Sequence, residues 1–98
     1  MNKIILITGC SSGFGMLAAA RLAAGGHTVY ATMRNLKKQD TLKLELKERD
    51  TKCQILPLDV TDDNSISKVI NTIEKQDSRL DVLINNAGYG IGGFFEDL

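Results

Sequence analysis

Short runs of consecutive apolar residues, separated by stretches of mixed polarity, form the main pattern along this chain. They occupy residues 3–8, 28–33, 52–56 and 80–84, and β-branched side chains are frequent in them. Strands buried on both faces of a parallel sheet have this continuous apolar character, whereas half-exposed strands alternate apolar with polar residues. The pattern therefore predicts four strands over these ranges.

Two of the intervening stretches have the character of helices. Residues 13–24 are rich in alanine and end at Gly25-Gly26, which is typical of a helix and its C-terminal stop. In residues 64–76, apolar side chains recur three and four positions apart behind a capping cluster of Thr, Asp and Asn. These recurring positions are Ile66, Val69, Ile70 and Ile73. Helices over 13–24 and 64–76 are therefore predicted.

The segment 36–49 carries two conflicting signals. Residues 41–47 alternate like a strand, while their Leu, Lys and Glu content favours a helix. Parallel strands must be joined by a crossover, usually a helix, so the order of the elements favours the helix. Strands and helices then alternate as in half of a doubly wound parallel α/β sheet with right-handed crossovers. We expect the strand order 3-2-1-4, which would leave the strand over 80–84 as an open edge.

The composition describes one ordinary globular domain. The 98 residues carry twelve Lys and Arg against twelve Asp and Glu, so the formal net charge is zero. Nucleic-acid binding needs a basic excess, and no apolar run approaches the ~18 residues that span a bilayer. Two cysteines without C-x-x-C spacing and a single histidine do not make a metal site. We therefore expect a cytoplasmic protein with no nucleic-acid partner, no membrane span and no metal.

A glycine-rich stretch lies between the first predicted strand and the first predicted helix. Residues 8–15 read Thr-Gly-Cys-Ser-Ser-Gly-Phe-Gly, at the place where an open α/β sheet binds its ligands. Glycine accepts positive φ in a tight turn and lets backbone N–H groups and a helix N-terminus approach a pyrophosphate. A purely structural glycine turn is the alternative.

The same stretch also satisfies a second motif. Gly9-x-Ser11-x-Gly13 matches the G-x-S-x-G nucleophile elbow of hydrolases, which lies on a strand-turn-helix. A catalytic triad needs a histidine, and the only one, His27, precedes the second strand. A six-residue strand at ~3.3 Å per residue would separate His27 from Ser11 by roughly 20 Å. We therefore expect His27 to be a surface loop residue and regard an esterase as the weaker hypothesis.

Two further motifs follow the third and fourth predicted strands. The first is Leu58-Asp59-Val60, and residues 85–88 read Asn-Asn-Ala-Gly. The succession of Thr-Gly-x-x-x-Gly-x-Gly, Asp-Val and Asn-Asn-Ala-Gly resembles the short-chain dehydrogenase/reductase family, and the resemblance covers the entire chain. It implies a Rossmann fold that binds a nicotinamide dinucleotide.

The resemblance implies roles for the residues of the first two motifs. The glycine turn would line the dinucleotide, and its Ser and Phe residues would present backbone or hydroxyl donors. These residues are Gly9, Ser11, Ser12, Gly13, Phe14 and Gly15. Asp59 and Val60 would flank the adenine, although Asp59 could instead cap the helix that begins near Asp62.

The third motif would lie beside the adenine-side ribose. Asn86, Ala87 and Gly88 match the family's positions there, while Asn85 would tie strands together through its amide. Residues 89–93, with three glycines, would form a flexible loop at the mouth of the site.

The family's catalytic residues have no counterpart in residues 1–98. They are a Ser on a fifth strand, a Tyr-x-x-x-Lys pair on the following helix, and an assisting Asn. We therefore expect the cofactor-binding half of an oxidoreductase, truncated before the catalytic half, that moves hydride between the cofactor and a carbonyl or secondary alcohol. A non-catalytic nucleotide-binding or interaction module is the alternative. We expect homo-oligomers of the full-length enzyme, and Phe94 and Phe95 hint at a lipophilic small-molecule substrate.

The end of the second strand predicts which dinucleotide binds. NAD-selective sites place an acid about twenty residues past the glycine motif, where it binds the ribose hydroxyls and repels a 2′-phosphate. Residues 32–35 read Thr-Met-Arg-Asn and contain no acid. The guanidinium of Arg34 suits a phosphate, so the sequence predicts a preference for NADP(H), with NAD(H) as the alternative.

Overall fold

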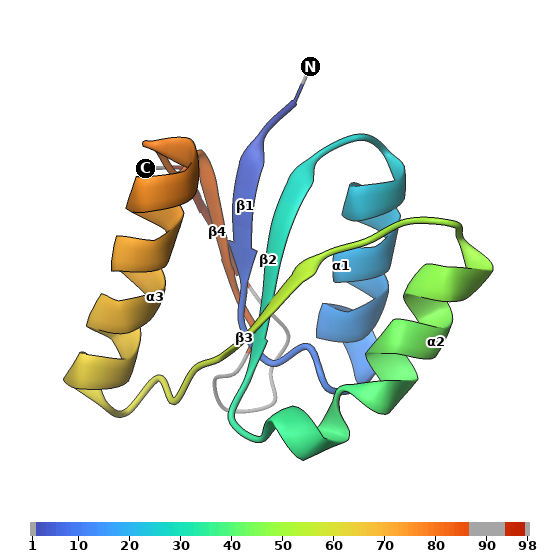
Figure 1. The fold of residues 1–98 in the computed structure, drawn as a ribbon, viewed down its shortest axis with the longest axis horizontal. Coiled ribbons are helices and arrows are strands. Elements are labelled where there is room, and N and C mark those ends of the chain that lie inside the picture. Colours follow the sequence, from blue (N-terminus) through green and yellow to red (C-terminus); the bar gives the residue numbers. More distant parts are fainter. Residues whose placement is uncertain (1, 87–93, 98) are drawn as a thin grey trace.

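The frame of the structure is a sheet with helices on both of its faces (Figure 1). The structure is a computed structural model that describes residues 2–86 and 94–97. Its elements are β1 (Ile4–Ile7), α1 (Gly13–Ala24), β2 (Thr28–Met33), the 3₁₀ helix η1 (Leu36–Lys38), α2 (Asp40–Glu48), β3 (Gln54–Pro57), α3 (Asp63–Asp77), β4 (Val82–Asn85) and β5 (Phe94–Asp97). Helices α1 and α2 cover one face, and α3 covers the other. This arrangement confirms the doubly wound α/β fold.

The strands follow the order β3-β2-β1-β4-β5. β1 to β4 are parallel to one another, which confirms the predicted order 3-2-1-4. The expectation that the fourth strand is an open edge is wrong, because β5 pairs with it in antiparallel orientation. Pairing gives partners to backbone groups that an open edge would leave exposed.

The crossover between β2 and β3 is helical, as the order of elements indicated, but it is divided. The side chain of Asn35 accepts a hydrogen bond from the backbone N–H of Lys37 and caps η1, and α2 follows after Gln39. Beyond α2, the backbone N–H of Thr51 still donates to the carbonyl of Leu46. The chain therefore reaches the sheet only at Gln54, two residues later than predicted.

The core is divided between the two faces by the alternation of side chains along each strand. Ile5 and Ile7 pack on the face of α1 and α2, whereas Ile4 and Leu6 pack on the face of α3. Small alanines on α1 bring this helix close to the sheet, at Ala19, Ala20 and Ala23. Because both faces are covered, the whole of β1 is buried, which explains its continuous apolar sequence.

Helix α3 buries only part of its predicted apolar stripe. Val69 and Ile73 are buried against the sheet, as the periodicity indicated. Ile66 and Ile70 remain 36% and 38% exposed. The helix is therefore confirmed, and its contact with the sheet is narrower than the sequence suggested.

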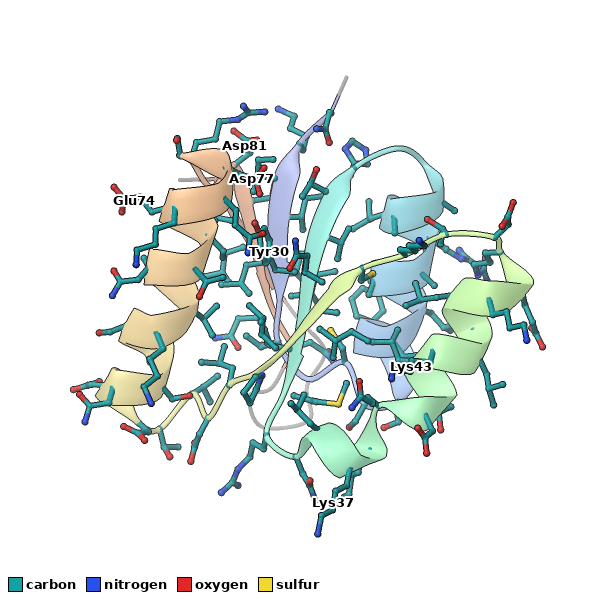
Figure 2. All side chains as sticks on the ribbon, viewed as in Figure 1. Tyr30, Lys37, Lys43, Glu74, Asp77 and Asp81 are labelled. Carbon is teal, nitrogen blue, oxygen red and sulfur yellow. The ribbon has the colours of Figure 1, made fainter. Side chains whose placement is uncertain are left out.

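Tyr30 joins β2 to the C-terminal turn of α3. Its side chain is fully buried, and its hydroxyl hydrogen-bonds the carboxylate of Asp77 and lies 3.1 Å from Oε1 of Gln76. Figure 2 shows Tyr30 and Asp77 next to each other between the sheet and this helix. Burial, followed by the hydrogen bond to Asp77, raises the pKa of the Tyr30 phenol above its usual range.

Asp81, just before β4, links this strand to the start of β1 by hydrogen bonds. Its Oδ2 accepts a hydrogen bond from the backbone N–H of Ile4 at 2.7 Å, and its own N–H donates to the carbonyl of Ile4. Arg79 also contacts this carboxylate, at 3.0 Å. The amide of Ile4, with a smaller contribution from Arg79, lowers the pKa of Asp81 below its usual range.

Candidate dinucleotide site

The glycine-rich turn begins where β1 ends, between β2 and β4. The backbone N–H of Thr8 donates to the carbonyl of Ile84 at 3.0 Å, and that of Cys10 donates to the carbonyl of Thr32 at 2.9 Å. The turn is thus bonded to both neighbouring strands at their carboxyl ends. This edge is where open α/β sheets bind ligands.

Three glycines of this turn have specific conformational or spatial requirements. Gly9 and Gly13 adopt φ values of 70° and 60°, which side chains disfavour. Gly15, in the first turn of α1, lies so close to the carbonyl oxygen of Gly9 that a Cβ would be only 2.3 Å from it. The three glycines therefore bring the start of α1 against the end of β1.

The N-terminus of α1 is not capped by the side chain at its own capping position. Ser12 occupies the capping position with an extended backbone, and its side chain makes no capping hydrogen bond. The first N–H groups of a helix have no partner within the helix, and they attract anions. Ser12 and Phe14 are exposed beside them, and Ser11 is half-buried. The structure thus brings together all the turn residues that the sequence singled out.

Two asparagines at the end of β4, Asn85 and Asn86, brace the turn. The backbone N–H of Asn86 donates to Oγ1 of Thr8 at 2.9 Å, and its Nδ2 donates to the carbonyl of Gly9 at 3.2 Å. Thr8 in turn donates to Oδ1 of Asn85 at 3.0 Å, which shows Asn85 tying β1 to β4 as expected. A position beside the ribose stays a prediction for Asn86. The predicted site residues Ala87 and Gly88 lie outside the described residues, as does the predicted loop 89–93.

Arg34 and Asp59 meet at the carboxyl ends of β2 and β3. Nη2 of Arg34 lies 3.7 Å from Oδ2 of Asp59. Oδ1 of Asp59 accepts hydrogen bonds from the backbone N–H and the hydroxyl of Thr61, at 3.0 and 2.7 Å. Chiefly these bonds, and also Arg34, lower the pKa of Asp59 below its usual range.

The alternative role for Asp59, as the cap of the next helix, is wrong. Asp62 occupies that position, and its side chain accepts a hydrogen bond from the backbone N–H of Asn64. Val60 is half-buried and packs against the core on the face of α3. Contacts of Asp59 and Val60 with an adenine stay predictions.

The residues required for a serine hydrolase do not meet. Nδ1 of His27 accepts a hydrogen bond from the backbone N–H of Lys3, just before β1, whereas Ser11 follows that strand. The two side chains therefore lie at opposite ends of the sheet. His27 is half-buried and holds the N-terminal segment, so the expectation of a simple surface residue is also incomplete. Cys10, inside the turn, is buried, which raises its pKa to about 12 and makes it a packing residue.

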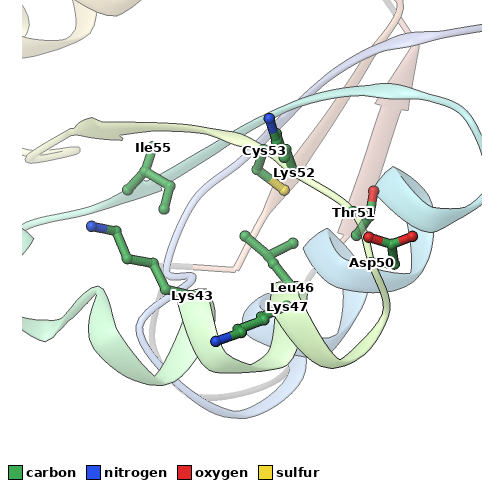
Figure 3. Close-up of a pocket in the computed structure, with 8 residues that line it drawn as sticks. All are labelled: Lys43, Leu46, Lys47, Asp50, Thr51, Lys52, Cys53 and Ile55. Carbon is green, nitrogen blue, oxygen red and sulfur yellow. The ribbon is translucent and has the colours of Figure 1, made fainter.

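A groove of about 420 Å³ lies away from this edge (Figure 3). It runs between α2 and β3, and Leu46, Cys53 and Ile55 are among its lining residues, together with three lysines. The described residues include no group of three His, Cys, Asp or Glu side chains that could hold a metal ion. Among these residues there is also no helix of the length and hydropathy needed to cross a membrane.

Two features of the site escaped the sequence analysis. The first is the bracing of Thr8 and Gly9 by Asn86, and the second is the carboxylate of Asp59 beside Arg34. The predicted strand order contained the signal for both. It places the end of β1 beside that of β4, and the end of β2 beside that of β3, so polar residues just after neighbouring strands should meet.

Comparison with known proteins agrees with this geometry. The family model described as short chain dehydrogenase matches residues 3–98. A 3-ketodihydrosphingosine reductase from Bacteroides thetaiotaomicron is 44% identical over 94 residues, which are 96% of this chain and 31% of that protein. Retinol dehydrogenase 8 from Bos taurus is 40% identical over 100 residues, with 98% of this chain and 31% of that protein covered.

A solved structure shares the fold. The crystal structure of NAD⁺-bound xylitol dehydrogenase superimposes with a TM-score of 0.76 and 25% sequence identity, over 89% of this chain and 34% of that one. The chain thus spans about a third of the length of the relatives that it matches. From the match over residues 3–98 and the motifs assembled at the sheet edge, we conclude that the chain belongs to the short-chain dehydrogenase family.

Proposed function

We propose that residues 1–98 form the dinucleotide-binding part of an oxidoreductase that transfers hydride between NADP(H) and a carbonyl or secondary alcohol. The observation that carries the proposal is the close approach of α1 to β1. There is no room for a Cβ on Gly15, because the backbone of Gly9 and the side chain of Asn86 lie too close. This close packing places the N-terminus of α1, which the Ser12 side chain does not cap, at the ligand edge of the sheet. A pyrophosphate is the group that this arrangement suits.

The residues would divide the work along the dinucleotide. The N–H groups at the start of α1 would receive the pyrophosphate, while Asp59 and Val60 would flank the adenine. Asn86, with Ala87 and Gly88, would lie beside the ribose. A bound nicotinamide supplies the hydride chemistry, and the proton-transfer residues would come from the remainder of a longer protein. We accordingly expect residues 1–98 alone to show no turnover.

The preference for NADP(H) rests on Arg34. Its side chain is 76% exposed at the end of β2, so the guanidinium is accessible to a phosphate. A charge-assisted hydrogen bond is worth ~1.5–3 kcal/mol, so Arg34→Ala should weaken NADPH binding about 10- to 150-fold and leave NADH binding nearly unchanged.

Titration calorimetry of both cofactors on a chain extended to full length tests this proposal. Arg21→Ala is the matched control, because Arg21 lies in the last turn of α1, far from the ligand edge. Equal losses for the two cofactors in Arg34→Ala would contradict the NADP preference, and no binding of either cofactor to the unaltered full-length chain would contradict the function itself.

We further propose a hydrophobic substrate, homo-oligomers and a cytoplasmic location for the longer protein. The names of the relatives, a 3-ketodihydrosphingosine reductase and a retinol dehydrogenase, support the first of these. Gel filtration and substrate screening of the longer protein would test oligomerisation and substrate. Both cysteines are free, as suits a reducing compartment. Fluorescence microscopy of a tagged longer protein would test the location.

A further inference from the structure

The ends of β2 and β3 place opposite charges side by side. The two strands pair in parallel with Met33 opposite Pro57, so the residues that follow them emerge at the same edge of the sheet. Arg34 follows β2 and Asp59 follows β3, with 3.7 Å between Nη2 and Oδ2. Residues 32–35 contain no acid, but Arg34 still has an acidic neighbour, because Asp59 follows the adjacent strand.

The carboxylate of Asp59 is held in place by its own loop. Thr61 donates two hydrogen bonds to Oδ1, and the backbone N–H of Asp59 donates to Oγ of Ser65 at 2.9 Å. Oδ2 is the oxygen that remains for Arg34. The side chain of Asp59 is 34% exposed against 76% for Arg34, so the carboxylate is the more constrained member of the pair.

We propose that Asp59 is a specificity-determining residue, whose carboxylate beside Arg34 weakens the attraction of that guanidinium for the 2′-phosphate of NADP(H). This inference rests on the proposed function, because it assumes that a dinucleotide binds at this edge. A phosphate that reaches Arg34 must share the guanidinium with Asp59 and lies close to a second negative charge. The site therefore prefers NADP(H) over NAD(H) by less than Arg34 alone would provide.

The variant Asp59→Asn removes the charge and keeps the shape. Its side-chain oxygen can still accept from Thr61, so the loop should keep its conformation. Charges a few ångströms apart near a protein surface interact strongly enough that the ratio of NADPH to NADH affinity should rise about threefold to thirtyfold. The ratio is the informative quantity, because any contact of this side chain with the adenine affects both cofactors alike.

Asp62→Asn is the matched control. It removes the same charge three residues away, from a side chain that caps α3, and asparagine caps helices as well as aspartate does. Its affinity ratio should equal that of the unaltered chain. An equal rise in both variants would mean that net charge alone matters and would overturn the proposal.

A double variant tests whether Asp59 acts through Arg34. In the Arg34→Ala background, Asp59→Asn should change the ratio by much less than it does in the unaltered chain. Calorimetry of NADPH and NADH binding to the four chains measures this coupling. An unchanged or lowered ratio in Asp59→Asn, or a full rise that persists without Arg34, would overturn the inference while leaving dinucleotide binding intact. Failure of both cofactors to bind the unaltered chain, extended to full length as in the calorimetry above, would instead overturn the proposed function, and this inference with it.

Discussion

A Cβ on Gly15 would lie 2.3 Å from the carbonyl oxygen of Gly9. That oxygen belongs to backbone that Asn86 holds by a hydrogen bond, so it cannot move away cheaply. We expect Gly15→Ala to lower the free energy of unfolding by about 1–3 kcal/mol through overpacking. Urea denaturation followed by circular dichroism measures the loss.

Gly25→Ala provides the control for this substitution. Gly25 has a φ of −79°, and a Cβ there would lie 3.5 Å from its nearest neighbour, which is ordinary contact. Its stability should be unchanged or raised by up to about 1 kcal/mol. Equal stabilities of the two alanine variants would show that the start of α1 can withdraw from β1.

The hydroxyl of Thr8 should contribute more to stability than its size suggests. Thr8 is 4% exposed, and its Oγ1 both donates to Asn85 and accepts from the backbone N–H of Asn86. Thr8→Val removes the acceptor and should cost about 1–3 kcal/mol, as expected when a donor loses its partner away from water. Thr72→Val, which removes only a hydroxyl bonded to the carbonyl of Lys68 within α3, should cost less than half as much. Equal losses would contradict the bracing role.

The sequence predicted most closely two elements that each consist of one continuous apolar or alanine-rich run. The bounds predicted for α1 and β2 match those of the structure, because a continuous apolar or alanine-rich run both begins and ends each element. The division of the segment 36–49 was not predicted, since it depends on the side chain of Asn35 capping a short 3₁₀ turn. A composition that favours a helix does not reveal that a side-chain hydrogen bond just before the segment ends its first turn as a separate 3₁₀ helix.

Contacts between distant parts of the chain were less predictable. Residue types alone indicated the glycine turn and Arg34, because each offers a chemical group to a ligand. The bracing of Gly9 by Asn86 and the approach of Asp59 to Arg34 depend instead on which strand ends become neighbours. The pairing of β5 with β4 was also missed, because Phe94 and Phe95 were interpreted only as a hint at the substrate and not as part of a strand.

Acid should weaken the link between β1 and β4. Contact with the N–H of Ile4 holds the pKa of Asp81 below its ordinary value of 3.8. A carboxyl whose pKa is lower in the folded than in the unfolded state stabilises the folded state at pH values above its unfolded-state pKa. This stabilisation disappears as the pH falls through the folded-state pKa. Unfolding free energies measured between pH 7 and pH 2 should therefore fall below about pH 4. The unfolding free energy of Asp81→Asn should fall less steeply with decreasing pH than that of the unaltered chain. Identical pH profiles for the two chains would contradict the link.

Alkali should weaken the contact between Tyr30 and α3. The pKa of Tyr30 is raised in the folded state, so the contribution of its neutral phenol is complete below pH ~10 and is lost as the pH rises above that unfolded value. At pH 7, Tyr30→Phe should lower the free energy of unfolding by about 1–3 kcal/mol. Between pH 9 and pH 12, the free energy of unfolding of this variant should fall by less than that of the unaltered chain.

Phenolate absorbance provides an independent measurement of the same group. The chain has two tyrosines and no tryptophan, so the titration at 295 nm contains few overlapping signals. Tyr30→Phe should remove a late component that appears in the unaltered chain. Titration of Tyr30 at the pH of free tyrosine would contradict the buried contact with Asp77.

The position of β1 between β2 and β4 also determines when this central strand can be paired on both sides during synthesis. One neighbour of β1 exists once Met33 has left the ribosome, but the other neighbour, and the asparagine that holds Gly9, exist only after Asn86 has been added. At about 5–20 residues per second, the nascent chain spends roughly 3 to 10 s with one side of its central strand unpaired. During this interval the apolar residues of β1 are open to chaperones and to other nascent chains.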